Sequence, residues 1–197
     1  MKGSPYKLEA IGDIVRESLL VKQAILGDQQ LLETVASVGE KMVLALKEGK
    51  KLFFFGNGGS AADAQHLAAE FVGRFNRQRR ALPAIALTTD TSILTSISND
   101  YSYESVFARQ LEGLGSPGDI AVGISTSGSS PNVLSGIRFA NEAGLVAVGL
   151  TGLSGKELVK LSHYCIRVPS DHTPRIQEAH ILIGHILCEM VDEGLAS

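Results

Sequence analysis

The sequence has little of several features that assign a protein to a class at once. It contains only two cysteines, Cys165 and Cys188, which lie in apolar segments and form no CxxC pair, so buried, reduced thiols are the simplest interpretation. No apolar run approaches the ~20 residues that a membrane-spanning helix needs, and residues 1–6 lack the apolar stretch of a signal peptide. The net charge of −3 gives no basic excess for nucleic acid. We therefore expect a cytoplasmic protein that binds neither membranes nor nucleic acid.

What is present is helical and strand periodicity along the whole chain. The 197 residues, 44% hydrophobic and 20% charged, suffice for one globular domain. Two helices are predicted over residues 8–25 and 29–48, with Gly27-Asp28 between them and Gly49 after the second. Two helices ahead of any strand cannot both belong to a crossover connection, so we expect them to share two roles, covering the sheet and forming oligomer contacts.

After residue 50, short apolar runs alternate with helical stretches. The predicted strands are 52–55, 84–87, 119–124, 145–150 and 164–168, and the predicted helices are 60–75, 92–98, 104–114, 132–142, 157–161 and 173–193. This alternation predicts right-handed βαβ units. The expected fold class is α/β, a doubly wound five-stranded parallel sheet with helices on both faces. The N-terminal helical extension (1–50) and the ligand-binding part (51–197) form one domain.

Ligands of such folds bind outside the carboxyl ends of the strands. The loop after the first strand, residues 56–60, is rich in glycine and opens a helix, so its N–H groups could hold an anion. It has no Walker A lysine. Gly56, Gly58 and Ala61 match a loose dinucleotide pattern, but the acid that should follow about 20 residues on is best matched by Asp90, 34 positions after Gly56. A dinucleotide site is therefore disfavoured.

The loop after the third strand carries a sharper signal. Five of the six residues 125–130 bear hydroxyl groups, and Pro131, a favourable first helical residue, follows directly. Hydroxyls and backbone amides at a helix start suit a phosphate monoester. A serine-rich turn and helix cap is the alternative. Five hydroxyls exceed what capping needs, so phosphate binding is favoured.

Polar residues on two predicted helices form a second candidate site. His66 and Glu70 share a helix face and could hold one metal ion, or they could be an exposed pair without function. Gln177, His180 and His185 lie on the apolar last helix, where satisfied core histidines are the alternative. Gln177 and His185 are separated by a rise of about 12 Å and about 80° of azimuth. If both serve one ion, we expect them to come from different chains of an oligomer.

Two further segments keep more than one interpretation. Asn99-Asp100 could be a plain helix end or could contact a ligand. Arg74, Arg77, Arg79 and Arg80 could form a solvated loop, or they could contact an anionic sugar or a neighbouring subunit.

Three of these segments together resemble the sugar isomerase (SIS) domain family. They are residues 56–66 (GNGGSAADAQH), 125–128 (STSG) and 175–180 (RIQEAH), and the resemblance covers essentially the whole chain. It implies the SIS fold and a cytoplasmic homotetramer with active sites at subunit interfaces. The most similar branch of the family converts D-sedoheptulose 7-phosphate to D-glycero-D-manno-heptose 7-phosphate through an enediol. This is the first step toward the activated heptose of lipopolysaccharide or other bacterial surface polysaccharides.

The resemblance also implies the roles of individual residues. Glu70 and His185 match the catalytic base and acid, and we expect assembly to bring them together. His66, Glu70, Gln177 and His185 match the ligands of one Zn²⁺ per subunit. Substrate contacts are implied for Asn57, Gly58, Gly59, Glu70, Asn99, Asp100, Ser125, Thr126, Ser127, Ser130 and Gln177.

The sequence departs from the family pattern in one place and leaves one alternative function. Some members have an acid two residues before, or directly before, the arginine of the RIQE motif, where this chain has Thr173 and Pro174, so no role of that acid is transferred. A non-enzymatic branch binds the bacterial replication initiator and lacks the glutamate and the final histidine. Because Glu70 and His185 are both present, the enzyme is favoured.

Overall fold

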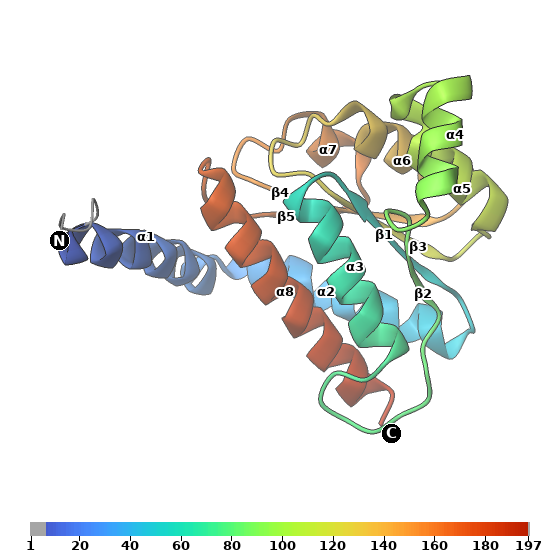
Figure 1. Cartoon of the computed structure of the whole chain (residues 1–197). Coiled ribbons are helices and arrows are strands. Elements are labelled where there is room, and N and C mark those ends of the chain that lie inside the picture. Colours follow the sequence, from blue (N-terminus) through green and yellow to red (C-terminus); the bar gives the residue numbers. More distant parts are fainter. Residues whose placement is uncertain (1–6, 197) are drawn as a thin grey trace, which may run out of the picture.

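The computed structural model describes residues 7–196, which form one parallel sheet enclosed by helices (Figure 1). The α/β fold class is confirmed, and each predicted element is present close to its predicted bounds. Residues 1–6, judged above to lack a signal-peptide stretch, lie outside the described part. The strands are β1 (Leu52–Gly56), β2 (Ala84–Ala86), β3 (Ile120–Ile124), β4 (Val146–Thr151) and β5 (Tyr164–Arg167). The helices are α1 (Leu8–Gly27), α2 (Gln29–Lys47), α3 (Gly59–Val72), α4 (Thr91–Asp100), the 3₁₀ helix η1 (Tyr103–Ser105), α5 (Val106–Leu114), α6 (Pro131–Glu142), α7 (Lys156–Leu161) and α8 (Thr173–Gly194).

The strand order of the sheet determines where a ligand can bind. The order is β2-β1-β3-β4-β5, and all neighbouring strands are parallel. After β1 the chain moves outward to β2, whereas after β3 it moves in the opposite direction to β4 and β5. The loops after β1 and β3 therefore diverge at the switch point, which is where open α/β sheets form their ligand crevice.

Helices cover both faces of the sheet, so its central strands are buried on both sides. In β1, Leu52 and Phe54 face the layer of α2, α3 and α8, whereas Phe53 and Phe55 face the layer of α4, α5, α6 and α7 (Figure 1). These four side chains are at most 1% exposed. Each such burial stabilises the fold by about 1.5–3 kcal/mol, which explains why β1 is a continuous apolar run instead of an alternating one.

The two N-terminal helices differ in how they contact the rest of the molecule. α2 packs against α8 and β5, which confirms that part of the extension covers the sheet. α1 projects from the body (Figure 1) and buries only Ile25. Several large apolar side chains of α1 are exposed, namely Leu8, Ile11, Ile14, Val15, Leu19, Leu20 and Leu26. The expected use of this extension in oligomer contacts stays a prediction.

Helix lengths follow from local capping. Asp28 and Asp90 accept hydrogen bonds from the backbone N–H groups of Leu31 and Ile93 and so begin α2 and α4, which accounts for Asp90 without a dinucleotide. α3 ends at Val72, earlier than the predicted residue 75, because Gly73 follows and the chain turns into a loop there. None of the helices within residues 7–196 is long and apolar enough to span a membrane.

Candidate functional site

The glycine-rich loop after β1 lies at the switch point and leads into α3. Gly58 has φ +56° and is the last residue before the helix. Gly59 lies against the Gln177 side chain of α8, because a Cβ added to Gly59 would be 2.3 Å from Gln177 Nε2. The missing side chain at Gly59 thus lets Gln177 reach the start of α3. The N–H groups of this first turn are the donors that an anionic or hydroxylated ligand could use.

The hydroxyl-rich loop after β3 lies next to the first loop and brings its hydroxyl oxygens together in a connected series. Ser125 Oγ is 2.9 Å from Ser130 Oγ and 3.4 Å from Ser127 Oγ, and Ser129 Oγ is 3.0 Å from Ser127 Oγ. The backbone oxygen of Thr126 accepts the N–H of Gly152, which fixes the loop to the segment after β4. Ser130 precedes α6, so the hydroxyls converge at a helix N-terminus. This arrangement fits a phosphate group.

A reciprocal pair of amides joins the two loops. Asn57 Nδ2 donates to Asn132 Oδ1, and Asn132 Nδ2 donates to Asn57 Oδ1, both at 2.8 Å. The Tyr103 hydroxyl donates to Asn57 Oδ1 at 3.0 Å. Sequence reasoning identified Asn57 but missed Asn132 and Tyr103. The position of Asn132 in the first turn after the hydroxyl loop was a usable signal, whereas nothing in the sequence pointed to Tyr103.

Asn99 and Asp100 lie at the C-terminal end of α4. Asn99 Nδ2 donates to Asp100 Oδ1 at 2.8 Å, and both residues are exposed. They precede Tyr103, whose hydroxyl reaches Asn57, so the chain places them toward the same edge of the sheet.

The second candidate site lies between α3 and α8. His66 and Glu70 extend from α3 and His185 extends from α8, and one ligand atom from each lies within 4.8 Å of the others. His66 Nε2 is 2.8 Å from His185 Nε2 and 3.4 Å from Glu70 Oε1. The Phe75 ring packs beside His185 at 5.3 Å between centroids. Burial raises the pKa of Asp63, and the electrostatic effect of the nearby His66 opposes that shift. We call His66, Glu70 and His185 the trio.

The trio bears on two expectations, one about how Glu70 and His185 meet and one about where Gln177 lies. Glu70 and His185 meet within a single chain, so the expectation that assembly is needed to bring them together is wrong. Gln177 instead contacts Gly59, seven positions before His66 on α3, a rise of about 10 Å. One chain therefore places Gln177 and His185 at different positions along the α3–α8 contact.

His180 has a different role from the other histidine of α8. It is 1% exposed, and its Nε2 lies 3.2 Å from the backbone oxygen of Thr151, at the end of β4. Its Nδ1 is buried without a partner in the described part of the chain. Burial lowers the pKa of His180 to about 4, opposed by the hydrogen bond to Thr151. The core-histidine interpretation is therefore the one that fits His180.

This buried imidazole predicts a pH dependence of stability. The folded pKa of about 4 lies below the ordinary 6.5, so the unfolded chain binds the extra proton and stability falls as pH drops from 6.5 toward 4. The shift corresponds to roughly 3 kcal/mol. His180→Gln keeps a donor for Thr151 but does not titrate, so its stability should fall less between pH 6.5 and pH 4. Urea unfolding of both proteins at pH 7 and pH 4.5 measures the difference, and equal pH dependence would contradict it.

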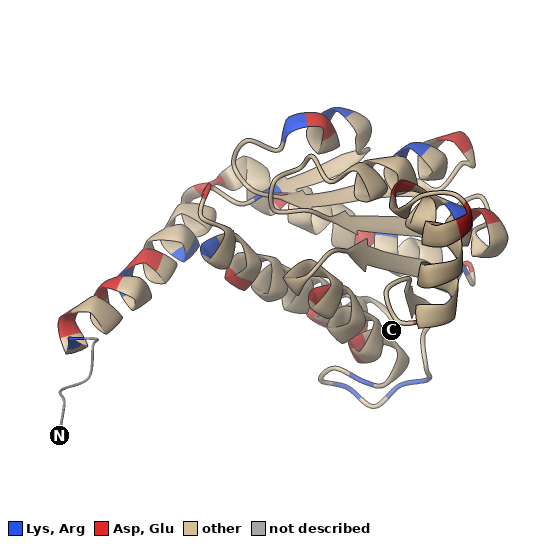
Figure 2. Ribbon diagram, turned by 45° about the horizontal axis from the view of Figure 1, so that its top comes forward, with Lys and Arg blue, Asp and Glu red and all other residues tan. Residues whose placement is uncertain are grey.

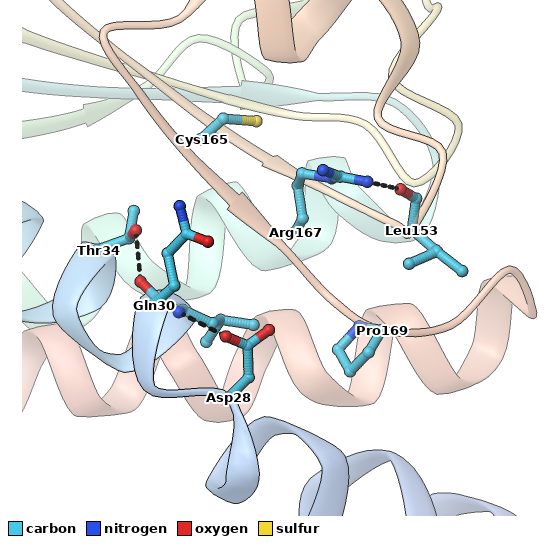
Figure 3. Close-up of a pocket in the computed structure, with 8 residues that line it drawn as sticks. Asp28, Gln30, Thr34, Leu153, Cys165, Arg167 and Pro169 are labelled. Atoms are coloured by element: carbon cyan, nitrogen blue, oxygen red, sulfur yellow. Dashed lines mark hydrogen bonds between the residues drawn. The ribbon is translucent and has the colours of Figure 1, made fainter.

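A polar cavity of about 220 Å³ beside the edge strand β5 is separate from these sites (Figure 3). Its polar groups serve local structure: Arg167 Nη2 donates to the Leu153 oxygen, and Thr34 donates to the Gln30 oxygen. Burial raises the pKa of Cys165 there to about 11, so its thiol stays protonated. Its lining residues are Asp28, Gln30, Leu31, Thr34, Leu153, Cys165, Arg167 and Pro169. This cavity shows no grouping of reactive side chains.

Comparison with known proteins agrees with the fold. The SIS domain family model matches residues 21–152. The chain is 52% identical to the phosphoheptose isomerase of Aneurinibacillus thermoaerophilus over 92% of its length and 91% of the relative. It is also 52% identical to that of Aquifex aeolicus, over 94% and 96% of the two chains.

Two solved structures are similar along nearly their whole length. The phosphoheptose isomerase of Neisseria gonorrhoeae superposes with a TM-score of 0.88 at 41% identity, covering 94% of this chain and 98% of that one. The Francisella tularensis enzyme gives 0.90 at 36% identity, with the same coverage. From its fold, the grouping of its polar residues and these relatives, the chain belongs to the SIS domain family and, within it, to the phosphoheptose isomerases.

Proposed function

We propose that this protein is an isomerase that converts D-sedoheptulose 7-phosphate to D-glycero-D-manno-heptose 7-phosphate through an enediol. The observation that carries the proposal is the meeting of Glu70 and His185 across α3 and α8, in a chain whose relatives are named phosphoheptose isomerases. The reaction needs a base for a carbon-bound proton, charge stabilisation at two oxygens and an anchor remote from the reacting carbons. The two candidate sites supply groups of each kind.

Glu70 transfers the protons bound to carbon, and His185 transfers the protons bound to oxygen. Glu70 removes a proton from C1 of the ketose and returns it to C2 of the enediol. His185 donates a proton to the oxygen on C2 and accepts the proton of the hydroxyl on C1, so the atoms balance. Both groups lie on rigid helices, which favours the fixed geometry that general acid–base catalysis requires.

The trio also fits a metal ion. Two imidazole nitrogens and one carboxylate oxygen within 4.8 Å of one another form a donor set that suits zinc. We propose that His66, Glu70 and His185 hold one Zn²⁺ per subunit, with Gln177 as the fourth ligand from a second copy of the chain. The bound ion would stabilise negative charge on the substrate oxygens. For Glu70 and His185 to act as base and acid as well, one carboxylate oxygen of Glu70 and the second ring nitrogen of His185 have to stay free of the ion, because a metal-bound oxygen is less basic and a metal-bound nitrogen carries no proton.

The hydroxyl loop is the proposed phosphate anchor. Ser125, Thr126, Ser127 and Ser130 would hold the phosphate, and Asn57 to Gly59 with Asn99 and Asp100 would contact the sugar. The connected series of hydroxyls at the start of α6 supports this assignment. Because the anchor is remote from the reacting carbons, its binding energy serves orientation.

Ser127→Ala tests the anchor. Ser127 Oγ is within hydrogen-bond distance of Ser125, and it accepts from Ser129. The variant should raise KM by roughly 3–10-fold, the net contribution of about one ordinary hydrogen bond, with a smaller change in kcat. Steady-state kinetics measure this split. A fall in kcat with unchanged KM would place the loop in the chemical step instead.

We further propose that the active unit is a homotetramer with active sites at subunit interfaces. The exposed apolar side chains of α1 support a contact between copies. The separation of Gln177 from His185 within one chain supports a metal site completed by a second chain. Light scattering should therefore find an oligomer, and a fully active monomer would contradict this.

Turnover of sedoheptulose 7-phosphate by the purified protein tests the proposed function. Activity should be lost on chelation and restored by Zn²⁺. The alternative, a cytoplasmic binding partner of the replication initiator without catalysis, predicts no turnover under either condition. The presence of Glu70 and His185 in one cluster favours the enzyme, and its product would enter heptose precursor synthesis in the cytoplasm.

A further inference from the structure

The loop that connects α3 with β2, residues 73–83, lies beside the C-terminal end of α8 and contains the four arginines (Figures 1 and 2). Sequence reasoning left open whether these side chains are merely solvated. Three of them, Arg74, Arg77 and Arg80, are exposed, but Arg79 is not, and its side chain is 11% exposed. Arg79 therefore has a structural environment that its neighbours lack.

Asp192 of α8 organises this loop. Its side chain is 1% exposed, so its charge has to be satisfied within the protein. Oδ2 accepts the backbone N–H groups of Asn76 at 2.8 Å and Arg77 at 3.0 Å, and Oδ1 accepts Arg79 Nε at 2.6 Å. These hydrogen bonds hold the pKa of Asp192 below its usual value against the opposing effect of burial. The carboxylate therefore stays charged and ties the loop to α8.

The guanidinium of Arg79 reaches from Asp192 to the end of α3. Nη2 donates to the backbone oxygen of Glu70 at 2.9 Å, and Nη1 donates to that of Phe71 at 2.8 Å. These carbonyls belong to the last turn of α3, where a helix leaves its oxygens without intrahelical donors and favours a cation. We call this arrangement the Arg79–Asp192 clamp. It joins the backbone of Glu70 directly to α8.

The clamp is placed to control the geometry of the trio. Asp192 follows His185 by seven residues, two turns of α8, so both side chains leave the same side of that helix. Glu70 and His66 lie on α3, and His185 lies on α8, so their separation depends on how the two helices are held together. Elsewhere along the contact between α3 and α8, a glycine without a side chain, Gly184, packs against Leu67. Ligand distances at a metal site tolerate only about 0.2 Å.

We propose that Arg79 is a positioning residue, which, with Asp192, fixes the Glu70 end of α3 relative to His185 for metal binding and proton transfer. This inference rests on the proposed function. A guanidinium is needed because it donates to a carboxylate and to two carbonyls at once from a planar fork. A lysine at this position would keep the ion pair with Asp192 but could not reproduce this planar set of donors.

Arg79→Lys is the decisive variant, and Arg80→Lys, the same exchange at the exposed neighbouring position, is its matched control. Zn²⁺ affinity is measured by competition with a chromophoric chelator, and kcat and KM are measured for sedoheptulose 7-phosphate. We expect Arg79→Lys to remain folded, to bind Zn²⁺ at least about 10-fold more weakly, and to lose kcat with KM within about twofold of wild type. Asp192→Asn should show the same pattern, and Arg80→Lys should match wild type.

Three results would overturn the proposed positioning role of Arg79. Zn²⁺ affinity and kcat of Arg79→Lys equal to those of Arg80→Lys would remove its positioning role. Failure of Arg79→Lys to fold, judged by circular dichroism, would make the clamp structural only, and absence of Zn²⁺ binding by the wild type would remove the site that it is proposed to serve. If the wild type binds Zn²⁺ but does not turn over the sugar phosphate, the proposed function fails. The comparison of Zn²⁺ affinity between Arg79→Lys and Arg80→Lys then still tests whether Arg79 positions the metal ligands.

Discussion

Glu70→Gln is expected to lower kcat for sedoheptulose 7-phosphate by about 10²–10⁴-fold, the usual contribution of a general base. Glutamine has the shape of glutamate and keeps an oxygen near His66, which lies 3.4 Å from Glu70 Oε1. It cannot accept the proton from carbon at a useful rate, so the loss should appear in kcat. KM should change little, because the proposed phosphate anchor lies at the other candidate site. Steady-state kinetics with a saturating substrate series measure both constants.

Two controls connect this loss with the carboxylate. Glu189→Gln removes the same charge from an exposed position on α8, four residues after His185, and should retain wild-type kcat. Zn²⁺ content of Glu70→Gln, measured in parallel, separates loss of the base from loss of the ion. A Glu70→Gln protein with kcat near that of Glu189→Gln would remove Glu70 from the chemistry.

The fold was predictable because its elements follow local rules. Four consecutive apolar residues from Leu52 to Phe55 indicate a strand buried on both faces, and all four are buried. Glycines, prolines and Asp caps marked the helix ends within a few residues. The main error in length, at the end of α3, arose where Arg79 supplies donors to the last carbonyls from outside the helix. Gly73 was a local signal for this helix end, whereas the contact with Arg79 has no local sequence signal.

The candidate site was predictable only in part, since half of it depends on packing between helices. The i,i+4 spacing of His66 and Glu70 is visible in the sequence, but the arrival of His185 from a helix more than 100 residues later is not. For the same reason, the amide pair of Asn57 and Asn132 was missed. The two asparagines lie 75 residues apart and meet because β1 and β3 are neighbours in the sheet. Sequence spacing shows which side chains are neighbours on one helix or strand. Contacts between different elements depend instead on the order of the strands in the sheet.

Gly128→Ala is expected to damage the phosphate anchor more than any single hydroxyl deletion. Gly128 has φ +65°, where an L-residue is strained by about 1–2 kcal/mol. Its added Cβ would also lie 2.1 Å from the backbone oxygen of Gly155, and the Gly128 oxygen is itself held by the N–H of Leu158. The loop therefore has to shift, at an additional cost of about 1–3 kcal/mol. We expect KM for the sugar phosphate to rise at least about tenfold, and the thermal midpoint to fall by roughly 4–20 °C.

Gly49→Ala separates the clash from the strain. Gly49 has φ +74°, but no heavy atom lies within 4 Å of its added Cβ, and it follows α2, in the turn that leads to the amino end of β1. This variant should lose only the stability that backbone strain accounts for, with KM unchanged. Because both variants make the same chemical change at a positive φ, the difference between them reports the contact of Gly128 with Gly155. Equal KM values in the two proteins would mean that the hydroxyl loop does not anchor the phosphate, and the reaction proposed for Glu70 and His185 would then need another anchor for its substrate.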